Sequence, residues 1–391
     1  MLSKYQGKTK IKLFPKRGYV LLLTGILIGF LVFSIISLLF STTMRSHEYI
    51  GIPKKIEFEF LCTSEKQGWI EEVKPKFEQW FYKKFGIEVK VILTVQGTHK
   101  TIDTILSYVA LGSQRTGPVA WSPASSIWIP YLNEKCKEEG YPGNIVEEWT
   151  PLVVTPTVIA CWKSFQEKYN ISSFTDLMKL SSSGIEFKYG HPDPQLSNGG
   201  TTAVVLEFSA AAGKTPDQLT RDDLTNETVK EAVRTLESNA VKYGESTGFF
   251  GRWAAENGPS QIQVFVVYEN VVIDNSLTAL KTWNDSLVAI YPEEGTILND
   301  HPFAILNATW VDVWERFAAS QFLLYLLDPS SQELAQKHGF RPANPSVPLD
   351  ESIFNEANGV KFKIDVPVLK PPPGDILEAI LTVWVDVKKS G

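Results

Sequence analysis

A long apolar segment near the N-terminus limits where the rest of this chain can fold. Gly18 to Phe40 is an apolar run of 23 residues without a charged side chain. A bilayer core of about 30 Å is spanned by about 20 helical residues, so the run is long enough to cross a membrane. Every charge before it is positive. The positive-inside bias therefore predicts a basic cytoplasmic leader over 1–17, a transmembrane anchor over 18–40 and an extracellular location for the bulk of a single-pass chain.

Two ways of processing this segment stay open. A cleaved signal peptide has an apolar core of about 7–15 residues, which is shorter than this run, so we expect an uncleaved or partly trimmed anchor. Lys16-Arg17-Gly18 also resembles the cleavage site of archaeal pilin-like signal sequences, in which the basic leader is removed and the apolar helix is kept. Residues 41–54 are expected to form a linker.

The part of the chain beyond the anchor is acidic. The first 45 residues hold seven of the 38 Lys and Arg residues and none of the 44 Asp and Glu residues, which leaves a formal charge of −13 for the remainder. Such a charge argues against nucleic acid and anionic lipid as partners. About 340 residues exceed the usual size of a single core, so we expect two lobes.

Cysteine usage and glycosylation motifs are compatible with an exported protein. Three cysteines allow at most one disulfide and exclude a disulfide scaffold. The chain holds Cys62, Cys136 and Cys161, of which Cys62 and Cys161 lie in apolar strand-like segments and are expected to be buried small hydrophobes. Four Asn-x-Ser/Thr motifs permit N-glycosylation. They begin at Asn170, Asn226, Asn284 and Asn307.

Strand-like and helix-like segments alternate, which is typical of an α/β protein. Strands are expected at 56–62, 87–95, 118–121, 151–162, 185–189, 264–268 and 287–291. Helices are expected at 69–85, 99–111, 122–139, 173–180, 197–212, 227–239, 310–327 and 375–388. The strand at 151–162 is long enough to leave one lobe and enter the next. We therefore expect the first part of lobe 1 over 55–155, lobe 2 over 156–268, and a return to lobe 1 with the C-terminal helices over 269–391.

The chain lacks the common local motifs of catalysis. It contains no zinc-type spacing of His and Cys, no phosphate-binding glycine loop and no Gly-x-Ser-x-Gly elbow, so no catalytic residue, metal or cofactor is expected. Hydroxyl-rich or glycine-rich turns instead stand between strands and helices, at 63–64, 122–126, 197–202 and 244–248. Any one of them is equally an ordinary helix N-cap. Several at the carboxyl ends of strands predict a site for a polar ligand.

These segments resemble the extracellular solute-binding proteins of ABC importers. The likeness is to the two-lobed, type II periplasmic-binding-protein group, which includes molybdate and sulfate receptors. The resemblance rests on 56–64, 121–128, 151–162, 268–270, 291–296, 300–303 and 339–345. The resemblance implies a two-lobed α/β ectodomain of this kind over 55–390, after one N-terminal transmembrane helix.

The resemblance also implies the ligand-binding residues. On the wall of lobe 1 it implies Thr63, Ser64, Ser122, Ser125 and Ser126. From lobe 2 or its hinge it implies Ser197, Asn198, Gly199, Gly200, Thr201, Ser246, Thr247, Tyr268 and Glu269. Carboxylates of Glu65, Glu245 and Glu269 stand beside these positions and repel an anion, so an oxyanion, a sugar, a peptide and a cationic solute all stay open. Four aromatic residues are candidates for stacking on a sugar ring: Trp121, Trp128, Trp253 and Tyr268.

The expected function is capture of a small polar solute between two lobes and its delivery to an ABC permease, without catalysis. A cell-surface glycan hydrolase is the first alternative; Glu245 and Glu269 are its candidate carboxylate pair, which would have to lie about 5–9.5 Å apart. A pilin-like surface subunit, assembled through 18–40, is the second.

Overall fold

The computed structural model describes residues 51–112 and 116–389. The described residues from Lys54 onward form one compact unit. The predicted leader at 1–17, the predicted anchor at 18–40 and most of the predicted linker lie outside the described residues. None of the helices that the structure describes has both the length and the apolar composition needed to span a bilayer.

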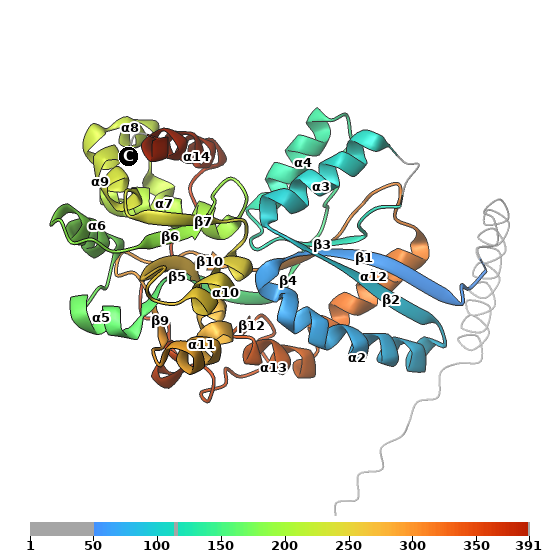
Figure 1. Cartoon of the computed structure of the whole chain (residues 1–391). Helices are drawn as coiled ribbons and strands as arrows, with labels where there is room; N and C mark the ends of the chain where they lie inside the picture. Colours follow the sequence, from blue (N-terminus) through green and yellow to red (C-terminus); the bar gives the residue numbers. More distant parts are fainter. Residues whose placement is uncertain (1–50, 113–115, 390–391) are drawn as a thin grey trace, which may run out of the picture. The chain divides into compact units, whose positions relative to one another are not determined.

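The first sheet has five strands in the order β2-β1-β3-β11-β4 (Figure 1). β1 (Lys55–Thr63) pairs in parallel with β2 (Glu88–Gln96) and β3 (Ala120–Ser122). β11 (Pro302–Ile305) runs antiparallel to β3 and to β4 (Thr150–Pro151). We call this sheet and the helices on it lobe 1.

Helices cover both faces of this sheet. α2 (Gln67–Phe85) buries Trp69, Ile70, Val73, Phe77 and Phe81, a helical spacing that forms one apolar stripe. This stripe packs with α12 (Val313–Leu326) in the aromatic core around Phe322. α3 (Thr98–Leu111) and α4 (Trp128–Glu138) belong to a second core cluster on the same sheet. α13 (Pro329–Lys337) contacts α2.

The second sheet is organised around β5 (Val153–Trp162), and we call it and its helices lobe 2. Its main order is β10-β5-β8-β6-β7, and β9 and β12 also pair with β5. The other strands are β6 (Tyr189–Pro192), β7 (Ala240–Gly244), β8 (Val264–Tyr268), β9 (Leu287–Ile290), β10 (Leu298–Asn299) and β12 (Arg341–Pro342). Only Leu152 separates β4 from β5, so the expected long strand does pass from one sheet to the other.

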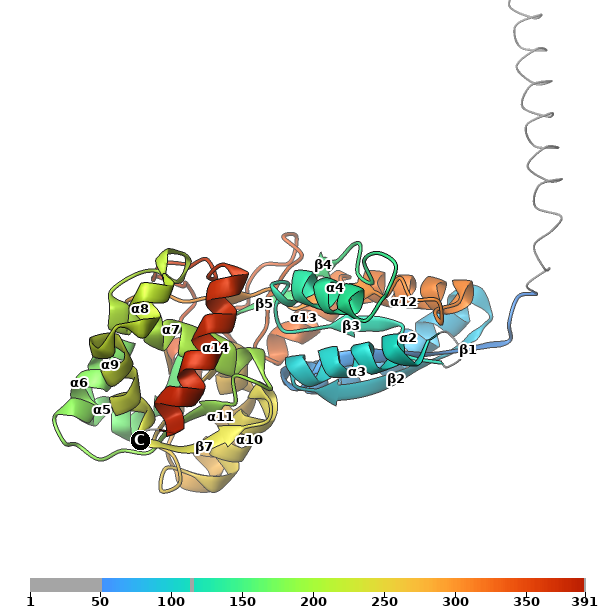
Figure 2. The same ribbon diagram turned by 90° about the horizontal axis from the view of Figure 1, so that it is seen from above.

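Eight helices of the described chain pack in lobe 2. They are α5 (Lys163–Tyr169), α6 (Phe174–Ser182), α7 (Asn198–Ala212), α8 (Arg221–Thr225), α9 (Glu227–Glu237), α10 (Thr247–Asn257), α11 (Glu269–Trp283) and α14 (Gly374–Lys389). α7 is buried on all sides over its first twelve residues. α14 contacts α7, α8 and α9 (Figures 1 and 2). The C-terminal part therefore divides between the lobes: α12 lies on lobe 1, whereas α14 lies on lobe 2.

Several expected elements differ from the structure in extent. The helix expected at 122–139 begins only at Trp128, because residues 123–127 form the turn after β3. The strand expected at 185–189 is β6, which begins at Tyr189. β7, α10 and α13 were not expected from the sequence pattern, because they are short or mix polar and small residues.

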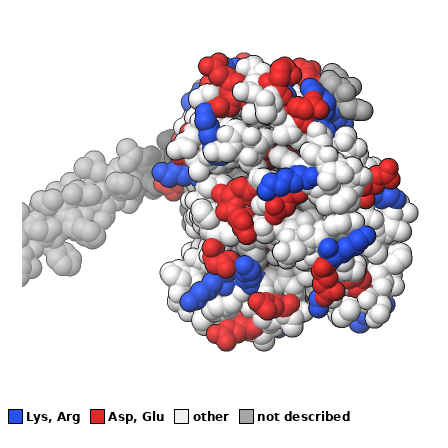
Figure 3. Space-filling view, turned by 90° about the vertical axis from the view of Figure 1, so that its left-hand side faces the viewer, with Lys and Arg blue, Asp and Glu red and all other residues white. Residues whose placement is uncertain are grey.

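All three cysteines are buried and free, as expected for Cys62 and Cys161 as small hydrophobes. Figure 3 shows the side of lobe 2 that lies on the left in Figure 1, where acidic and basic side chains are interspersed. Ion pairs in lobe 2 include Lys214–Asp223 and Lys230–Glu227. The four glycosylation motifs begin at exposed asparagines, so all four are accessible.

Candidate functional site

The polar turns of lobe 1 and lobe 2 meet in a buried contact between the two sheets. Ser64 follows β1, and Ser246 precedes α10. The Ser64 hydroxyl donates to Ser246 Oγ at 2.8 Å and accepts from the Gly248 N–H at 3.0 Å. Both serines are at most 2% exposed. Two turns that lie 182 positions apart in the chain are thus joined directly.

The serines at the helix starts do not act as helix caps. Ser197 and Ser246 occupy the N-cap positions of α7 and α10, but neither side chain accepts a hydrogen bond from its own helix. Ser197 Oγ instead lies 2.9 Å from Thr247 Oγ1. An N-cap hydroxyl ordinarily accepts a hydrogen bond from a free N–H group of its helix. These two hydroxyls instead bond to the side chains of Thr247 and Ser64.

Asn198 forms a second link between the lobes. Its Nδ2 donates to the Tyr268 hydroxyl and to Asn299 Oδ1, each at 2.7 Å. Its Oδ1 accepts from Trp128 Nε1 of lobe 1 at 2.7 Å. Asn198 and Tyr268 are fully buried. The first residue of α7 is therefore held by side chains from both lobes.

Glycines allow the two backbones to approach each other closely. A Cβ atom on Gly248 would lie 2.6 Å from Glu65 N and 2.6 Å from the carbonyl carbon of Ser64. A Cβ atom on Gly97, just before α3, would lie 2.5 Å from the Leu196 carbonyl oxygen. Both positions require glycine because the neighbouring atoms are backbone. The N-terminal ends of α3, α7 and α10 thus converge where the lobes touch.

A buried lysine lies at the centre of this contact. Lys66 is fully buried, and its Nζ donates to Thr63 Oγ1, to the Pro123 carbonyl at 3.3 Å and to His301 Nδ1 at 3.1 Å. Glu65 Oε1 lies 3.4 Å from the same Nζ, and it also accepts from Thr63. Neither Lys66 nor His301 was predicted from the sequence. Only the position of Lys66 just after β1 pointed to it.

Charge pairing fixes the ionisation of this group. Burial by itself would raise the pKa of Glu65, but Lys66 and His301 lower it to about 2. Burial lowers the pKa of Lys66, an effect that Glu65 opposes. Burial and the nearby Lys66 lower the pKa of His301 to about 4, so this imidazole is neutral at pH 7. The Glu65 carboxylate, which was expected to repel an anion, is thus paired with the ammonium of Lys66.

Some polar atoms in this region are buried without a hydrogen-bond partner. They include Ser122 Oγ and His301 Nε2. Because Lys66 donates to Nδ1 of the neutral ring, Nε2 carries the hydrogen and is a free donor. The His301 N–H donates to the Ala124 carbonyl at 3.1 Å, which holds the histidine beside the turn that follows Ser122. A buried polar atom without a partner costs about 1–3 kcal/mol, so each one calls for a compensating group such as a ligand, an ion or a water molecule.

The remaining predicted site residues lie at varying depth. Ser125 is buried near the start of α4, and half-buried Ser126 donates its N–H to Asp300. Thr201 donates to the Pro194 carbonyl inside lobe 2. Gly199 lies against the Thr247 side chain, and Gly200 against the Pro192 carbonyl.

Glu269 is not brought together with these residues. Its two oxygens accept from Arg341 Nε and Nη2, each at 2.7 Å, and one of them also accepts from the Tyr291 hydroxyl. Glu245 is exposed, and its backbone oxygen faces Gly97. Of the two carboxylates considered as a hydrolytic pair, Glu269 is therefore buried in an ion pair, whereas Glu245 is exposed.

A pocket of about 580 Å³ adjoins the contact between the lobes. Its lining includes His99, Trp128, Tyr131, Gln195, Pro372 and Leu377. Of the four aromatic residues considered for stacking, Trp128 lines this pocket. Trp121 and Tyr268 are fully buried, and Trp253 stacks on Phe250. The volume lies within the range of small-molecule pockets.

Comparisons with known proteins identify the family of this chain. A family model described as bacterial extracellular solute-binding protein matches residues 58–341. A sequence search of curated proteins finds no significant match. The match spans β1 to the first residue of β12 and does not include α14.

Solved structures share the fold at low sequence identity. The sulfate-binding protein SubI from Mycobacterium tuberculosis is 15% identical with a TM-score of 0.54, and the alignment covers 86% of this chain and 99% of that one. The periplasmic binding protein AfuA from Actinobacillus pleuropneumoniae is 16% identical with a TM-score of 0.59, covering 86% and 100%. A putative spermidine/putrescine ABC transporter protein from Listeria monocytogenes is 14% identical with a TM-score of 0.57, covering 86% and 99%. At these identities the likeness concerns the fold.

Proposed function

This chain belongs to the bacterial extracellular solute-binding proteins, and on that premise we propose that it captures a small polar solute between lobe 1 and lobe 2 and delivers it to an ABC importer. The observation that carries the proposal is the buried polar contact between the lobes, in which Ser122 Oγ and His301 Nε2 have no partner. A solute placed there would supply the missing hydrogen bonds. Binding energy then comes mainly from neutral donors in a closed site.

The solute is proposed to present acceptor oxygens, as an oxyanion or a sugar does. His301 Nε2 and the Ser122 hydroxyl are free to donate. The N-terminal ends of α3, α7 and α10 converge beside them, and helix N-termini favour acceptors and negative charge. The charge of Glu65 is offset by Lys66, so it no longer argues against an anion. A cationic solute or a peptide has less support.

Entry of the solute is proposed to require a hinge motion of the two lobes. Opening would separate Ser64 from Ser246 and Trp128 from Asn198, which are among the direct hydrogen bonds between the lobes. The segments that connect the sheets, around Leu152 and around His301, are natural hinges. We retain 55–155 as the first part of lobe 1 and 156–268 as lobe 2. The expected return of 269–391 to lobe 1 holds only for β11, α12 and α13, because α11, β9, β10, β12 and α14 lie with lobe 2.

The chain is proposed to be anchored in the cell membrane through residues 18–40, with residues 55–391 outside the cell. This topology rests on the apolar run and the cations before it. A tethered receptor stays near its permease. The permease itself is a proposed partner.

The test is thermal unfolding of the purified full chain against oxyanions, sugars and peptides. At about 100 times its dissociation constant, a solute adds about 2.7 kcal/mol to the free energy of unfolding. The shift should disappear in Ser122→Ala and His301→Gln and persist in Ser164→Ala, a control whose hydroxyl bonds Asp285 on the exposed surface. Mass spectrometry should detect no product.

Absence of any shift, in folded chain shown to carry no co-purified solute, would overturn the proposal. Release of product from a glycan would support the hydrolase alternative. The engagement of Glu269 with Arg341 and Tyr291 already argues against that alternative, because both oxygens of the carboxylate accept hydrogen bonds from the protein.

A further inference from the structure

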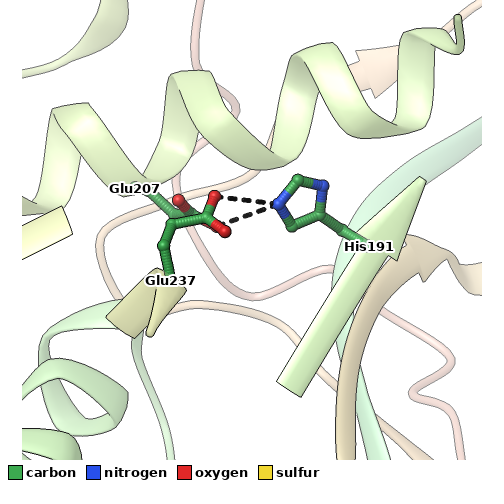
Figure 4. Close-up of side chains that lie close together, drawn as sticks. All are labelled: His191, Glu207 and Glu237. Atoms are coloured by element: carbon green, nitrogen blue, oxygen red, sulfur yellow. Dashed lines mark hydrogen bonds and ion pairs between the residues drawn. The ribbon is translucent and has the colours of Figure 1, made fainter. Parts of the chain in front are cut away.

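A second buried polar cluster lies in lobe 2, apart from the contact between the lobes. His191 comes from β6, Glu207 from α7 and Glu237 from the last turn of α9. His191 Nε2 lies 3.0 Å from Glu237 Oε1 and 4.0 Å from Glu207 Oε1. Figure 4 shows the imidazole ring facing both carboxylates. The exposed fractions are 0% for His191 and Glu207 and 5% for Glu237.

The surrounding hydrogen bonds orient these three side chains toward one point. His191 Nδ1 lies 2.7 Å from the Pro192 carbonyl oxygen, so Nδ1 carries a hydrogen. Nε2 lies 3.0 Å from Glu237 Oε1, and a bound metal ion would take the place of the hydrogen that Nε2 donates there. A histidine that binds a metal ordinarily donates its other ring N–H to a carbonyl or carboxylate in this way. The sequence contains no local metal spacing because the three residues come from separate elements.

Neighbouring donors hold the two carboxylates in place. The Tyr189 hydroxyl donates to Glu207 Oε1 at 2.6 Å. Tyr243 donates to Glu237 Oε2 at 2.7 Å, and Trp384 Nε1 of α14 donates to Glu237 Oε1 at 2.5 Å. These bonds still leave Glu207 Oε2 buried and without a hydrogen-bond partner. The unpartnered oxygen is an independent sign that this cluster accepts a further group.

Charge points to the nature of that group. Two adjacent buried carboxylates favour the binding of a proton or a cation, and burial together with Glu237 raises the pKa of Glu207. Among the described residues, the ion pairs of Glu207 and Glu237 involve only His191. The ammonium of Lys388 lies over the rings of Tyr243 and Trp384, at 3.8 and 4.7 Å from their centroids, and not against the carboxylates. A divalent cation would neutralise both acids and leave the imidazole neutral.

We propose that His191, Glu207 and Glu237 bind a divalent transition metal ion of the zinc type. One ligand atom from each residue lies within 4.8 Å of the others. Zinc–ligand bonds of about 2.0–2.2 Å in a tetrahedral site place ligand atoms about 3.3–3.6 Å apart, so the distances of 3.0 and 4.0 Å require only small adjustments. Glu207 Oε2 is available as the further ligand. Imidazole and carboxylate together suit Zn²⁺.

The role of this ion is structural, because the site is enclosed by protein. It links β6, α7 and α9, and Trp384 extends the link to α14. α14 lies beyond residues 58–341, which match the family model. The metal thus fastens a C-terminal helix to lobe 2, and its binding contributes to folding.

The experiment measures metal in the full chain, purified without chelators, by inductively coupled plasma mass spectrometry. It then titrates chelator-treated chain with Co²⁺, whose visible absorption reports tetrahedral coordination. One equivalent of zinc per chain and a saturable Co²⁺ signal are expected, together with a higher melting temperature when metal is restored. Glu207→Gln keeps the side-chain size and the acceptor for Tyr189, and it should weaken metal binding at least about 10-fold.

His338→Gln is the matched control, because His338 also stands between two carboxylates, 3.3 Å from Glu72 and 3.4 Å from Asp274, but at the protein surface. This variant should keep the full metal content. Folded wild-type chain without bound metal, or folded Glu207→Gln with unchanged metal content and affinity, would overturn the proposal. The wild-type measurement decides the matter even if a variant fails to fold.

Discussion

Replacing Lys66 by methionine tests the electrostatics of the contact between the lobes. Methionine fills a similar volume but cannot pair with a carboxylate. The substitution leaves Glu65 buried, with the Thr63 hydroxyl as its remaining hydrogen-bond donor and His301 Nδ1 3.3 Å from Oε1. Removing one member of a buried ion pair costs about 3–5 kcal/mol, because the remaining charge is buried without compensation. We therefore expect Lys66→Met to lower the free energy of unfolding by several kcal/mol at pH 7.

The structure gives an independent measure of this effect. The pKa of Glu65 lies at about 2, against an ordinary value of 4.5. Each unit of difference corresponds to about 1.4 kcal/mol, so the favourable surroundings of the carboxylate contribute about 3 kcal/mol. Because the pKa is lower in the folded state, this stability is present above pH 4.5 and is lost as the pH falls toward 2. In Lys66→Met the loss in acid should be smaller or reversed.

The assay is calorimetry of the full chain at pH 7 and at pH 3–4. Unfolding a unit of about 340 residues has an entropy of about 0.7 kcal/mol/K near its midpoint, so 3–5 kcal/mol corresponds to a fall of about 4–7 °C. Glu65→Gln/Lys66→Met is the control, because it leaves no buried charge and should recover part of the loss. A single variant that melts within 1 °C of wild type, or a double variant less stable than the single one, would refute the reasoning.

Three further predictions address closure, packing and thiol chemistry. Gly248→Ala should weaken solute binding about 10-fold in calorimetric titration, because the new Cβ atom would meet the backbone of lobe 1 and such overpacking costs about 1–3 kcal/mol. Gly374→Ala is the control and should leave the affinity unchanged, because a Cβ atom there meets nothing within 4 Å. Phe322→Ala should lower the free energy of unfolding in denaturant titrations by about 3–5 kcal/mol, because the ring contacts four phenylalanines and is fully buried; no loss would contradict this packing. The three cysteines should resist a thiol reagent in the native chain and react only after unfolding, since burial raises the pKa of each thiol; fast labelling of the folded chain would show them to be accessible.

The sequence predicted much of the fold through local patterns. The apolar stripe of α2 and the apolar run of β5 show in the sequence, because burial on one face leaves a period of 3.6 and burial on both faces leaves a continuous apolar segment. Elements such as β7 and α13 were not predicted, because short segments of mixed polarity show only a weak hydrophobic periodicity. The start of α4 was predicted too early, because a serine followed by proline at 122–123 is equally compatible with a helix start and with a turn.

The candidate site was predictable only in part, for a similar reason. Ser64, Ser246 and Asn198 stand in turns between elements, so their positions pointed to the edge of the sheets, where the structure joins them. Glu269 stands in a comparable position but lies against Arg341, 72 residues further along the chain. Nothing in the local sequence reveals such a partner.

The amino-acid sequence by itself determined the alternation of strands and helices, the apolar faces of the lobes and the placing of polar turns at strand ends. Tertiary structure decided which polar groups became buried and what they met. Lys66 reads as an ordinary surface lysine until α10 and His301 close over it. His191, Glu207 and Glu237 are unremarkable until β6, α7 and α9 bring them within 4.8 Å of one another. Local periodicity encodes how each segment is buried, whereas the pairing of charges depends on contacts between segments that are distant in the chain.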